Sequence, residues 1–173
     1  PPRSTLFPYT TLFRSMPAAM HSFYLRNMYQ ENRLVVPGGI ALAGVPIDLS
    51  TIKTPSFLLS TREDHIAPWK STYSATQIYK GPVTFTLAAS GHIAGVVNPP
   101  GKVKYGHWSN SKNPPSPDEW LSTAKQHPGS WWPSWEKWMT QYAGGSVPAR
   151  KPGDGKLKPI EDAPGSYVLV KAS

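Results

Sequence analysis

The chain contains no cysteine, no long hydrophobic run and no cluster of basic residues. Without cysteine it can form neither a disulfide framework nor a thiolate metal site, and this composition is consistent with the cytoplasm. No apolar run approaches the roughly 20 residues that a membrane-spanning helix needs. No charged and then apolar leader precedes a small-residue cleavage site. The sequence therefore predicts a protein without a transmembrane segment, and its composition agrees with the cytoplasm.

The composition is that of a folded domain rather than a disordered chain. Of the 173 residues, 39% are hydrophobic and 12% are aromatic, which is enough for a sizeable core. The net charge is +8 and the pI is near 9.7, which permits an acidic partner. The lysines and arginines are scattered, however, and lack the aromatic–basic alternation of a nucleic-acid surface. We therefore expect a solvated basic surface and no nucleic-acid partner.

The first fifteen residues differ in character from the rest of the chain. They have no helical or strand period, and the segment TLFPYTTLFRS (residues 5–15) resembles a translated sequencing adapter. We interpret residues 1–15 as an artefactual extension, and the alternative is a natural N-terminal arm. The protein proper is then expected to start near Met16.

The first half of the chain reads as a strand–helix–strand unit preceded by a helix and a bent strand. Pro68 suits the first turn of a helix, and Gly81-Pro82 is expected to end that helix. A helix between two β-rich runs predicts a parallel crossover, which should be right-handed. The expected elements are a helix over Ala18–Leu34, a hairpin or bent strand over Ile40–Leu49, a strand over Ser56–Ser60, a helix over Pro68–Lys80 and a strand over Val83–Ala88.

The second half contains much more proline and is expected to be less regular. Residues 98–117 read as a long ordered loop. Ser116, with Pro117 and Glu119 behind it, matches a capping box for a helix that reaches about Gln126. Ser130 can cap a further helix, whose aromatic residues form one apolar stripe that we expect to dock on the protein's own core. This stripe consists of Trp131, Trp132, Trp135, Trp138, Met139 and Tyr142. Residues 144–173 form a Gly-, Pro- and Lys-rich tail, with strand-like residues at Tyr167–Val170.

Two loops behind the predicted strands carry the candidate chemistry. The first places Asp64 just past one strand, and the second places His92 behind a Ser-Gly turn, 28 residues further on. Loops at the carboxyl ends of neighbouring parallel strands meet at one edge of a sheet. A carboxylate and an imidazole placed there form the acid–base half of a catalytic triad, in the order acid and then histidine. The chain contains no G-x-S-x-G or G-x-C-x-G turn that would supply the nucleophile.

Each of these residues also has a purely structural interpretation. Asp64 could stabilise the start of the following helix, and His92 could be a turn residue satisfied by the backbone. His65 is expected to point away from its neighbour and to pack in the loop. A metal site built from Asp64, His65, His92 and His107 lacks compact ligand spacing, so we expect no metal.

Four motifs then indicate a family. In chain order they are FYLRNMYQEN, STREDHIAPW, ASGHIAGVVNPPGK and HPGSWWPSW. Together they resemble the C-terminal part of a class I poly(R)-hydroxyalkanoate (polyhydroxybutyrate) synthase. The resemblance runs from about Met16 to the closing APGSYV segment, which is nearly everything outside the adapter-like stretch.

The resemblance implies an acyltransferase with a Cys–His–Asp triad on an α/β-hydrolase-like fold. Residues 16–143 would be the C-terminal part of that catalytic domain, with His92 as the base and Asp64 as the acid. The substrate would be an (R)-3-hydroxyacyl-coenzyme A, most simply the 3-hydroxybutyryl thioester, and no cofactor is implied. The partners would be the growing polyester chain and the polymer granule surface, and the full-length family would form homodimers. Tyr24 and Asn32 also match family positions, without an assigned role.

The chain departs from this family because the nucleophilic cysteine is absent, so we expect it to be inactive alone. Two alternatives remain open. One is an esterase or depolymerase fragment of the same fold, which would use an upstream serine and would have no reason to carry HPGSWWPSW. The other is a non-catalytic module that binds polymer granules through its Trp-rich helices.

Overall fold

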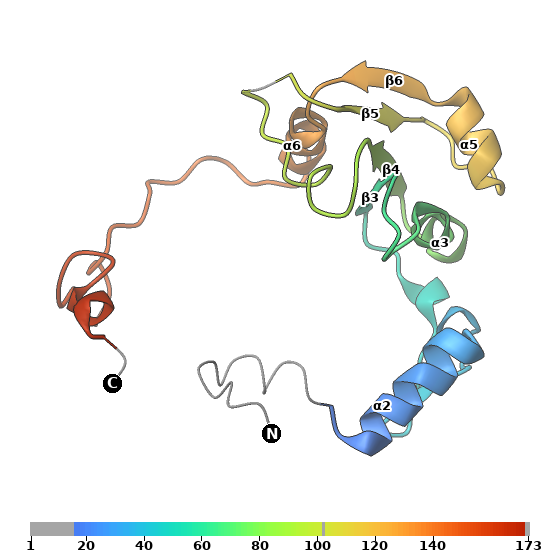
Figure 1. Ribbon diagram of the computed structural model, residues 1–173, viewed down its shortest axis with the longest axis horizontal. Helices are drawn as coiled ribbons and strands as arrows, with labels where there is room; N and C mark the ends of the chain where they lie inside the picture. Colours follow the sequence, from blue (N-terminus) through green and yellow to red (C-terminus); the bar gives the residue numbers. More distant parts are fainter. Residues whose placement is uncertain (1–15, 102, 172–173) are drawn as a thin grey trace. The chain divides into compact units, whose positions relative to one another are not determined.

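The computed structural model describes residues 16–101 and 103–171, and it divides into two units between Trp138 and Met139. The first unit holds a four-stranded sheet in the order β3-β4-β5-β6, with helices on both sides (Figure 1). Strands β3 (Ser56–Thr61) and β4 (Val83–Ala88) run parallel, with Leu58 opposite Phe85. Strands β5 (Gly106–Ser109) and β6 (Lys125–Pro128) continue the sheet in antiparallel fashion. The expected α/β class and the parallel pair are confirmed, and the sheet as a whole is mixed.

One face of the sheet carries an aromatic core. Alternate residues of a strand point to the same face, so Phe85 and Leu87 of β4 lie on one side together with Leu58 of β3. Against them pack helix α3 (Trp69–Tyr73) and helix α5 (Pro117–Thr123). Trp120 of α5 is fully buried and meets Phe85 edge-on, with ring centroids 5.0 Å apart. The buried members of this core are Trp69, Tyr73, Phe85, Leu87 and Trp120.

The opposite face of the sheet is covered by helix α6 (Trp132–Thr140), as Figure 1 shows. Phe57 of β3 lies on this face and contacts Trp138, with ring centroids 5.5 Å apart. His107 of β5 faces α6 as well, and its Nε2 lies 3.3 Å from the hydroxyl of Ser134. The Trp-rich stripe therefore docks partly on the protein's own sheet, as expected. The predicted cap is also confirmed, because the Ser130 hydroxyl accepts a hydrogen bond from the backbone N–H of Trp132.

The predicted helix over Pro68–Lys80 is wrong in its length. Two short helices replace it, α3 and α4 (Ala75–Ile78), with Ser74 between them. Around Ser74 the backbone hydrogen bonds tighten to a spacing of three residues, as in a turn. Tyr73 is anchored in the core and its hydroxyl donates to the carbonyl of Pro114. We attribute the break to this tertiary contact, which cannot be predicted from local helix propensity.

The first predicted helix is also shorter than expected. Helix α2 (Ala18–Tyr24) passes into the wide π-helical turn η1 (Leu25–Gln30), and Asn32 ends it in a left-handed conformation. The side chain of Asn27 donates to the carbonyl of Phe23, so it competes with the backbone for that acceptor. After the short 3₁₀ turn η2 (Arg33–Val35), strands β1 (Ala41–Leu42) and β2 (Val45–Pro46) form the predicted small hairpin. The 3₁₀ turn η3 (Leu49–Thr51) leads to β3.

Strands β5 and β6 lie in segments that were expected to be loop and helix. Their sequences lack an alternating apolar pattern, and they become strands through pairing with β4 and with each other. The predicted helix start at Ser116 is confirmed, because its hydroxyl accepts from the backbone N–H of Glu119, which is the first of the two hydrogen bonds of a capping box. Helix α5 nevertheless ends at Thr123 rather than near Gln126, since Lys125–Pro128 is recruited to the sheet.

The second unit, residues 139–173, holds the expected tail. The strand predicted at Tyr167–Val170 is wrong, because this segment forms the 3₁₀ turn η4 (Ser166–Leu169). Without a neighbouring strand to pair with among the described residues, a β-rich tetrapeptide cannot form a ladder. Among residues 16–101 and 103–171, no helix is both long and apolar enough to cross a bilayer.

Candidate functional site

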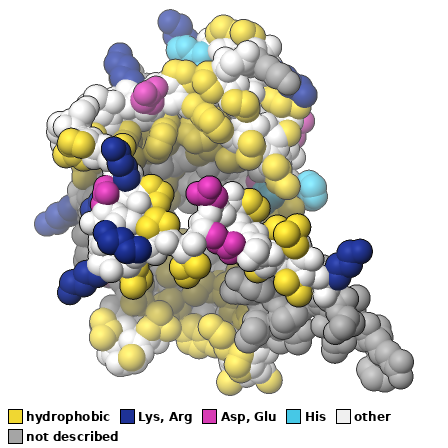
Figure 2. Space-filling model, turned by 90° about the vertical axis from the view of Figure 1, so that its left-hand side faces the viewer, with side chains coloured by type: hydrophobic (Ala, Val, Ile, Leu, Met, Phe, Trp, Pro, Cys, Tyr) yellow, Lys and Arg dark blue, Asp and Glu magenta, His cyan; other side chains and the backbone are white. Residues whose placement is uncertain are grey.

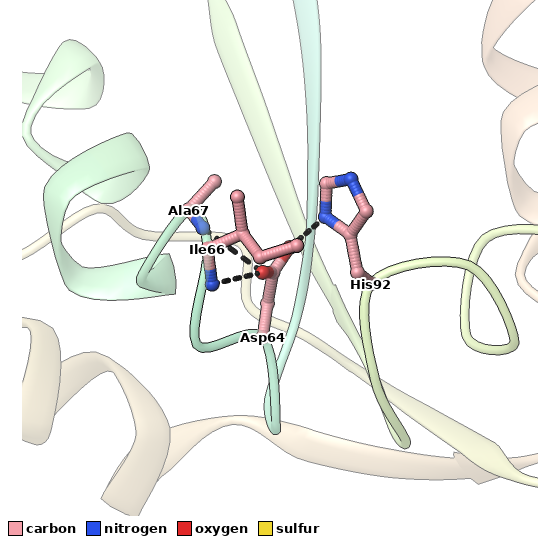
Figure 3. A network of polar contacts seen from close by, with 4 residues as sticks. All are labelled: Asp64, Ile66, Ala67 and His92. Atoms are coloured by element: carbon pink, nitrogen blue, oxygen red, sulfur yellow. Dashed lines mark hydrogen bonds and ion pairs between the residues drawn. The ribbon is translucent and has the colours of Figure 1, made fainter. Parts of the chain in front are cut away.

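Asp64 lies in the loop that follows β3, and the loop's own backbone holds its side chain. The N–H groups of Ile66 and Ala67 both donate to Asp64 Oδ1, each at 2.9 Å (Figure 3). An aspartate that accepts from the residues two and three positions ahead closes an Asx turn. The carboxylate is therefore fixed at the carboxyl end of β3, directly before Pro68 and helix α3.

His92 lies in the loop that follows β4, next to the Asp64 loop. The backbone N–H of Arg62 donates to the carbonyl of Ala88, and the N–H of Glu63 donates to that of Ser90. Ser90 adopts a positive φ of 74°, which turns the chain sharply before His92. The two loops are thus joined by backbone hydrogen bonds at the same edge of the parallel pair.

The two candidate residues meet directly. His92 Nδ1 lies 2.7 Å from Asp64 Oδ2, and the two residues are 28 positions apart. The carboxylate side chain is 8% exposed and the imidazole 48% exposed. A carboxylate can only accept, so the proton of this hydrogen bond lies on Nδ1 and a neutral imidazole keeps a lone pair on Nε2. Figure 3 shows Nε2 pointing away from Asp64. The predicted placement of the pair is confirmed, whereas its catalytic role stays a prediction.

The surroundings of Asp64 favour its ionised form. The backbone N–H of Ala67 and the imidazole of His92, followed by the N–H of Ile66, lower the pKa of Asp64 from 3.8 to about 2. Hydrogen bonds to the charged form stabilise it more than its partial burial disfavours it. At neutral pH this carboxylate is therefore a permanent acceptor for His92.

Gly95 allows the His92 loop to fold closely on itself and on the end of β3. A Cβ atom at this position would collide with the carbonyl oxygen of Ala89 and come within 2.5 Å of Thr61 Cγ2. Only a residue without a side chain fits this contact. Gly95 was not among the residues predicted from the sequence, although its place three residues after His92 in a loop at a sheet edge is a usable signal.

Two tryptophans of the apolar stripe, Trp131 and Trp132, also contact this loop. The indole N–H groups of Trp131 and Trp132 both donate to the backbone carbonyl of Val96, at 3.1 and 3.0 Å. A stripe read at helical spacing predicts which side chains share a face, but not where their polar atoms lie.

The other histidines considered for a metal site lie apart from this pair. His107 is buried, stacks on His127 with ring centroids 5.0 Å apart, and is hydrogen-bonded to the Gly129 carbonyl. Burial lowers the pKa of His107. His65 is exposed, next to Asp64. Within the described residues, no group of three His, Cys, Asp or Glu side chains is placed to hold a metal ion.

Tyr24 and Asn32 belong to the helical segment before the sheet. The Tyr24 hydroxyl donates to that of Tyr29 at 3.4 Å, and this contact raises the pKa of Tyr24. Asn32 borders a hollow of about 530 Å³ that is also lined by Ile66 and Ala67, the residues whose backbone holds Asp64. Asn32 is thus placed near the candidate site, and its role stays open.

Basic side chains are dispersed over the visible face of the molecule, among many hydrophobic ones (Figure 2). The dispersed charge agrees with the scattered lysines and arginines of the sequence.

Several large hydrophobic residues of α2 and η1 are exposed, and they line an apolar hollow of about 630 Å³ with Leu42.

The chain is similar to several poly(3-hydroxyalkanoate) polymerases. It is 43% identical over 98% of its length to the polymerase subunit PhaC of Cupriavidus necator. It is 51% identical over 91% to that of Rhizobium meliloti, and 50% identical over 91% to the polymerase of Methylorubrum extorquens. No protein-family model matches the chain.

The aligned region is only part of each relative. The chain spans 30%, 25% and 26% of the lengths of these three polymerases. The two alignments at 91% leave out about as much of the chain as residues 1–15 contain, whereas the Cupriavidus alignment at 98% extends into them. Residues 1–15 lie outside the described residues, so their interpretation as an adapter stays a prediction. The chain belongs to the poly(3-hydroxyalkanoate) polymerase family and is a fragment that matches the C-terminal part of such a polymerase.

Proposed function

We propose that residues 16–143 form the acid–base part of an acyltransferase that polymerises (R)-3-hydroxyacyl-coenzyme A, on an α/β-hydrolase-like fold. The observation that supports this proposal most directly is the 2.7 Å contact between Asp64 and His92 at the carboxyl ends of two parallel strands. Loops at this edge are where α/β folds place their chemistry. The similarity to named polymerases supports the reaction class.

His92 would act as the general base. Its Nε2 removes the proton from a cysteine thiol that another part of the polymerase supplies, and the resulting thiolate attacks the thioester carbonyl carbon of the substrate. The bond to the coenzyme A sulfur breaks, and the coenzyme A thiolate leaves and takes up a proton. The acyl group is then held as an enzyme thioester. In elongation, the 3-hydroxyl of another acyl unit attacks this thioester carbonyl as its proton passes to a base. An ester bond forms, the carbon–sulfur bond to the cysteine breaks, and the cysteine leaves as its thiolate.

Asp64 would orient His92 and stabilise the imidazolium that forms. Because its pKa is about 2, Asp64 is ionised at neutral pH and holds the Nδ1 proton of His92. In the neutral imidazole, a carboxylate in this position selects the tautomer that carries its proton on Nδ1, so that the lone pair of Nε2 can accept the thiol proton. Asp64 could alternatively help to activate the 3-hydroxyl of the incoming unit, and its separate effects on acylation and on elongation distinguish the two roles.

The remaining parts of the proposal follow the family resemblance. The segments GHIAG and HPGSWWP resemble those of class I synthases, which supports short-chain monomers. 3-Hydroxybutyryl-coenzyme A is therefore the first substrate to test. The whole polymerase would work as a homodimer on the surface of polyhydroxyalkanoate granules in the cytoplasm. No cofactor is proposed, because coenzyme A enters and leaves as part of the substrate.

A fusion tests this function. Residues 16–173 are joined to the part of the Cupriavidus polymerase that precedes the matching region, and free thiol is measured after addition of 3-hydroxybutyryl-coenzyme A. We expect thiol release and polymer from the fusion. His92→Ala should abolish both, and Asp64→Ala should reduce elongation by a factor of about 100 or more, the scale of a lost acid–base group.

His65→Ala is the matched control, because His65 is exposed and adjacent to Asp64. It should leave thiol release unchanged. A soluble, folded fusion whose activity is unaffected by His92→Ala would refute the proposed role of the pair. Free 3-hydroxybutyrate as the main product, instead of polymer, would support a hydrolase of the same fold. Binding to polymer granules by the 173-residue chain, with no activity in any fusion, would support a binding module.

A further inference from the structure

The carbonyl oxygen of Val96 accepts two hydrogen bonds from adjacent tryptophans. Trp131 Nε1 and Trp132 Nε1 lie 3.1 and 3.0 Å from it. A carbonyl oxygen has two lone pairs, so the two indoles together use its full accepting capacity. Trp131 directly precedes α6 and Trp132 is its first residue, and their acceptor lies four residues after His92.

The segment from Gly91 to Val97 is one tight turn, so Val96 and His92 move together. Within it the N–H of Gly95 donates to the carbonyl of Gly91, and the N–H of Val97 donates to that of Ile93. Gly95 is buried against Ala89 and Thr61, as described above. A shift of the Val96 carbonyl is therefore transmitted through this turn to the backbone of His92.

Trp131 is itself packed on the strand that leads to Asp64. The ring of Trp131 stacks on Phe57 of β3, with centroids 6.2 Å apart and an angle of 27° between the planes. Phe57 lies on β3, and Asp64 lies in the loop that follows this strand. Trp131, at the start of the α6 segment, therefore connects the His92 loop to the strand that leads to Asp64.

The imidazole needs such support because little else holds it. Its side chain is 48% exposed, and within the described residues its hydrogen bond to Asp64 is the only one that the structure shows. The direction of Nε2 therefore depends on where the loop backbone lies. A displacement of about 1 Å at a reacting group can lower a rate roughly 100-fold.

We propose that Trp131 and Trp132 are positioning residues, whose indole N–H groups hold the His92 loop through the Val96 carbonyl so that Nδ1 stays on Asp64 and Nε2 points outward. The catalytic consequence rests on the function proposed above, whereas the structural part concerns this chain alone. The residues do not touch the reacting atoms and act through the loop backbone.

The structural part is tested by NMR hydrogen exchange on the 173-residue chain. Trp→Phe removes the N–H donor and keeps an aromatic ring, so Trp131→Phe, Trp132→Phe and the double variant are compared with the parent chain. We expect faster exchange at the amides of Gly95 and Val97 and loss of the downfield Nδ1 proton signal of His92. The amides of Phe85 and Leu87 in the core should be unchanged.

Trp135→Phe is the matched control. Trp135 lies in the same helix and contacts the ring of Trp131, but its indole makes no hydrogen bond that the structure shows among the described residues. It should leave Gly95 and Val97 unaffected. If the single and double variants behave like Trp135→Phe at these two amides, the proposal is overturned. If the double variant also exchanges faster at the core amides of Phe85 and Leu87, its fold is disturbed as a whole. The exchange at Gly95 and Val97 in the two single variants then decides the question.

The catalytic part is tested in the fusion described above. Each Trp→Phe substitution at 131 or 132 should lower kcat about tenfold or more and leave KM nearly unchanged, because the proposed role concerns the direction of Nε2 in the chemical step. Equal kcat in these variants and in Trp135→Phe would overturn the catalytic part. If the unsubstituted fusion itself releases no thiol, the proposed function fails, and the exchange measurement still decides whether the tryptophans hold the loop.

Discussion

His92 contacts the one carboxylate oxygen of Asp64 that the backbone leaves available. Asp64 Oδ1 accepts from Ile66 and Ala67, and Oδ2 lies 2.7 Å from His92 Nδ1. The loop alone therefore orients the carboxylate, whereas the imidazole depends on the carboxylate and on its own loop. Removal of the imidazole should therefore leave the carboxylate in place, whereas removal of the carboxylate should leave the imidazole without its hydrogen bond.

His92→Ala should raise the pKa of Asp64 above about 2 without returning it to 3.8. The substitution removes one of the groups that lower this pKa, while the stronger contribution from Ala67 and the contribution from Ile66 remain. The carboxyl ¹³C signal of Asp64, followed through a pH titration, measures the shift. An unchanged pKa in the variant would show that His92 does not contact Asp64 in solution.

Asp64→Asn should change how the stability of the chain depends on pH. Folding lowers the pKa of Asp64 from 3.8 to about 2, so the ionised group contributes stability above about pH 4 that is lost as the pH falls through 2. The difference in unfolding free energy between the parent and Asp64→Asn should therefore shrink between pH 4 and 2. Urea denaturation at several pH values measures it, and a difference that stays constant over this range would contradict the prediction.

Gly95→Ala should destabilise the chain by about 1–3 kcal/mol, the usual range for an overpacked contact. The added Cβ meets the carbonyl of Ala89, which belongs to the backbone and cannot turn aside. Gly91→Ala in the same loop is the control, since its Cβ would meet nothing closer than the Glu63 carbonyl at 4.0 Å. It should change stability by less than about 0.5 kcal/mol. Equal effects of the two substitutions in urea denaturation would argue against the close contact at Gly95.

Deletion of residues 1–15 should leave the stability of the remaining chain unchanged. If these residues are translated adapter, nothing has matched them to the rest of the sequence. Thermal unfolding of residues 16–173 and of the whole chain, recorded by circular dichroism, should give the same midpoint. A clear loss of folded signal on deletion would identify them as a native arm.

The unfused chain should release no coenzyme A from 3-hydroxybutyryl-coenzyme A. His92 and Asp64 can move protons, but a chain without cysteine has no thiol to hold the acyl group. Thiol release is compared with a no-enzyme control and with His92→Ala. Release above the control that disappears in His92→Ala would overturn this prediction.

We also expect low solubility, because large hydrophobic residues of α2 and η1 are exposed.

The sequence predicted the part of the fold that depends on local patterns. The β-rich runs at Ser56 and Val83 became β3 and β4, and the hydroxyl of Ser116 caps the start of α5 as expected. The order of Asp64 and His92 behind two strands was enough to predict that they meet. Parallel pairing brings the ends of neighbouring strands together whatever the details of the loops are.

Other features were decided by the tertiary structure, because they depend on contacts between distant residues. Strands β5 and β6 exist through their pairing in the sheet, and the break at Ser74 accompanies the anchoring of Tyr73 on Pro114. The indoles of Trp131 and Trp132 reach Val96 across 35 and 36 residues, only because α6 packs on the face of the sheet that carries Phe57. Spacing along a helix predicts a shared face, but the atom that a polar group meets is set by how that helix packs on the sheet.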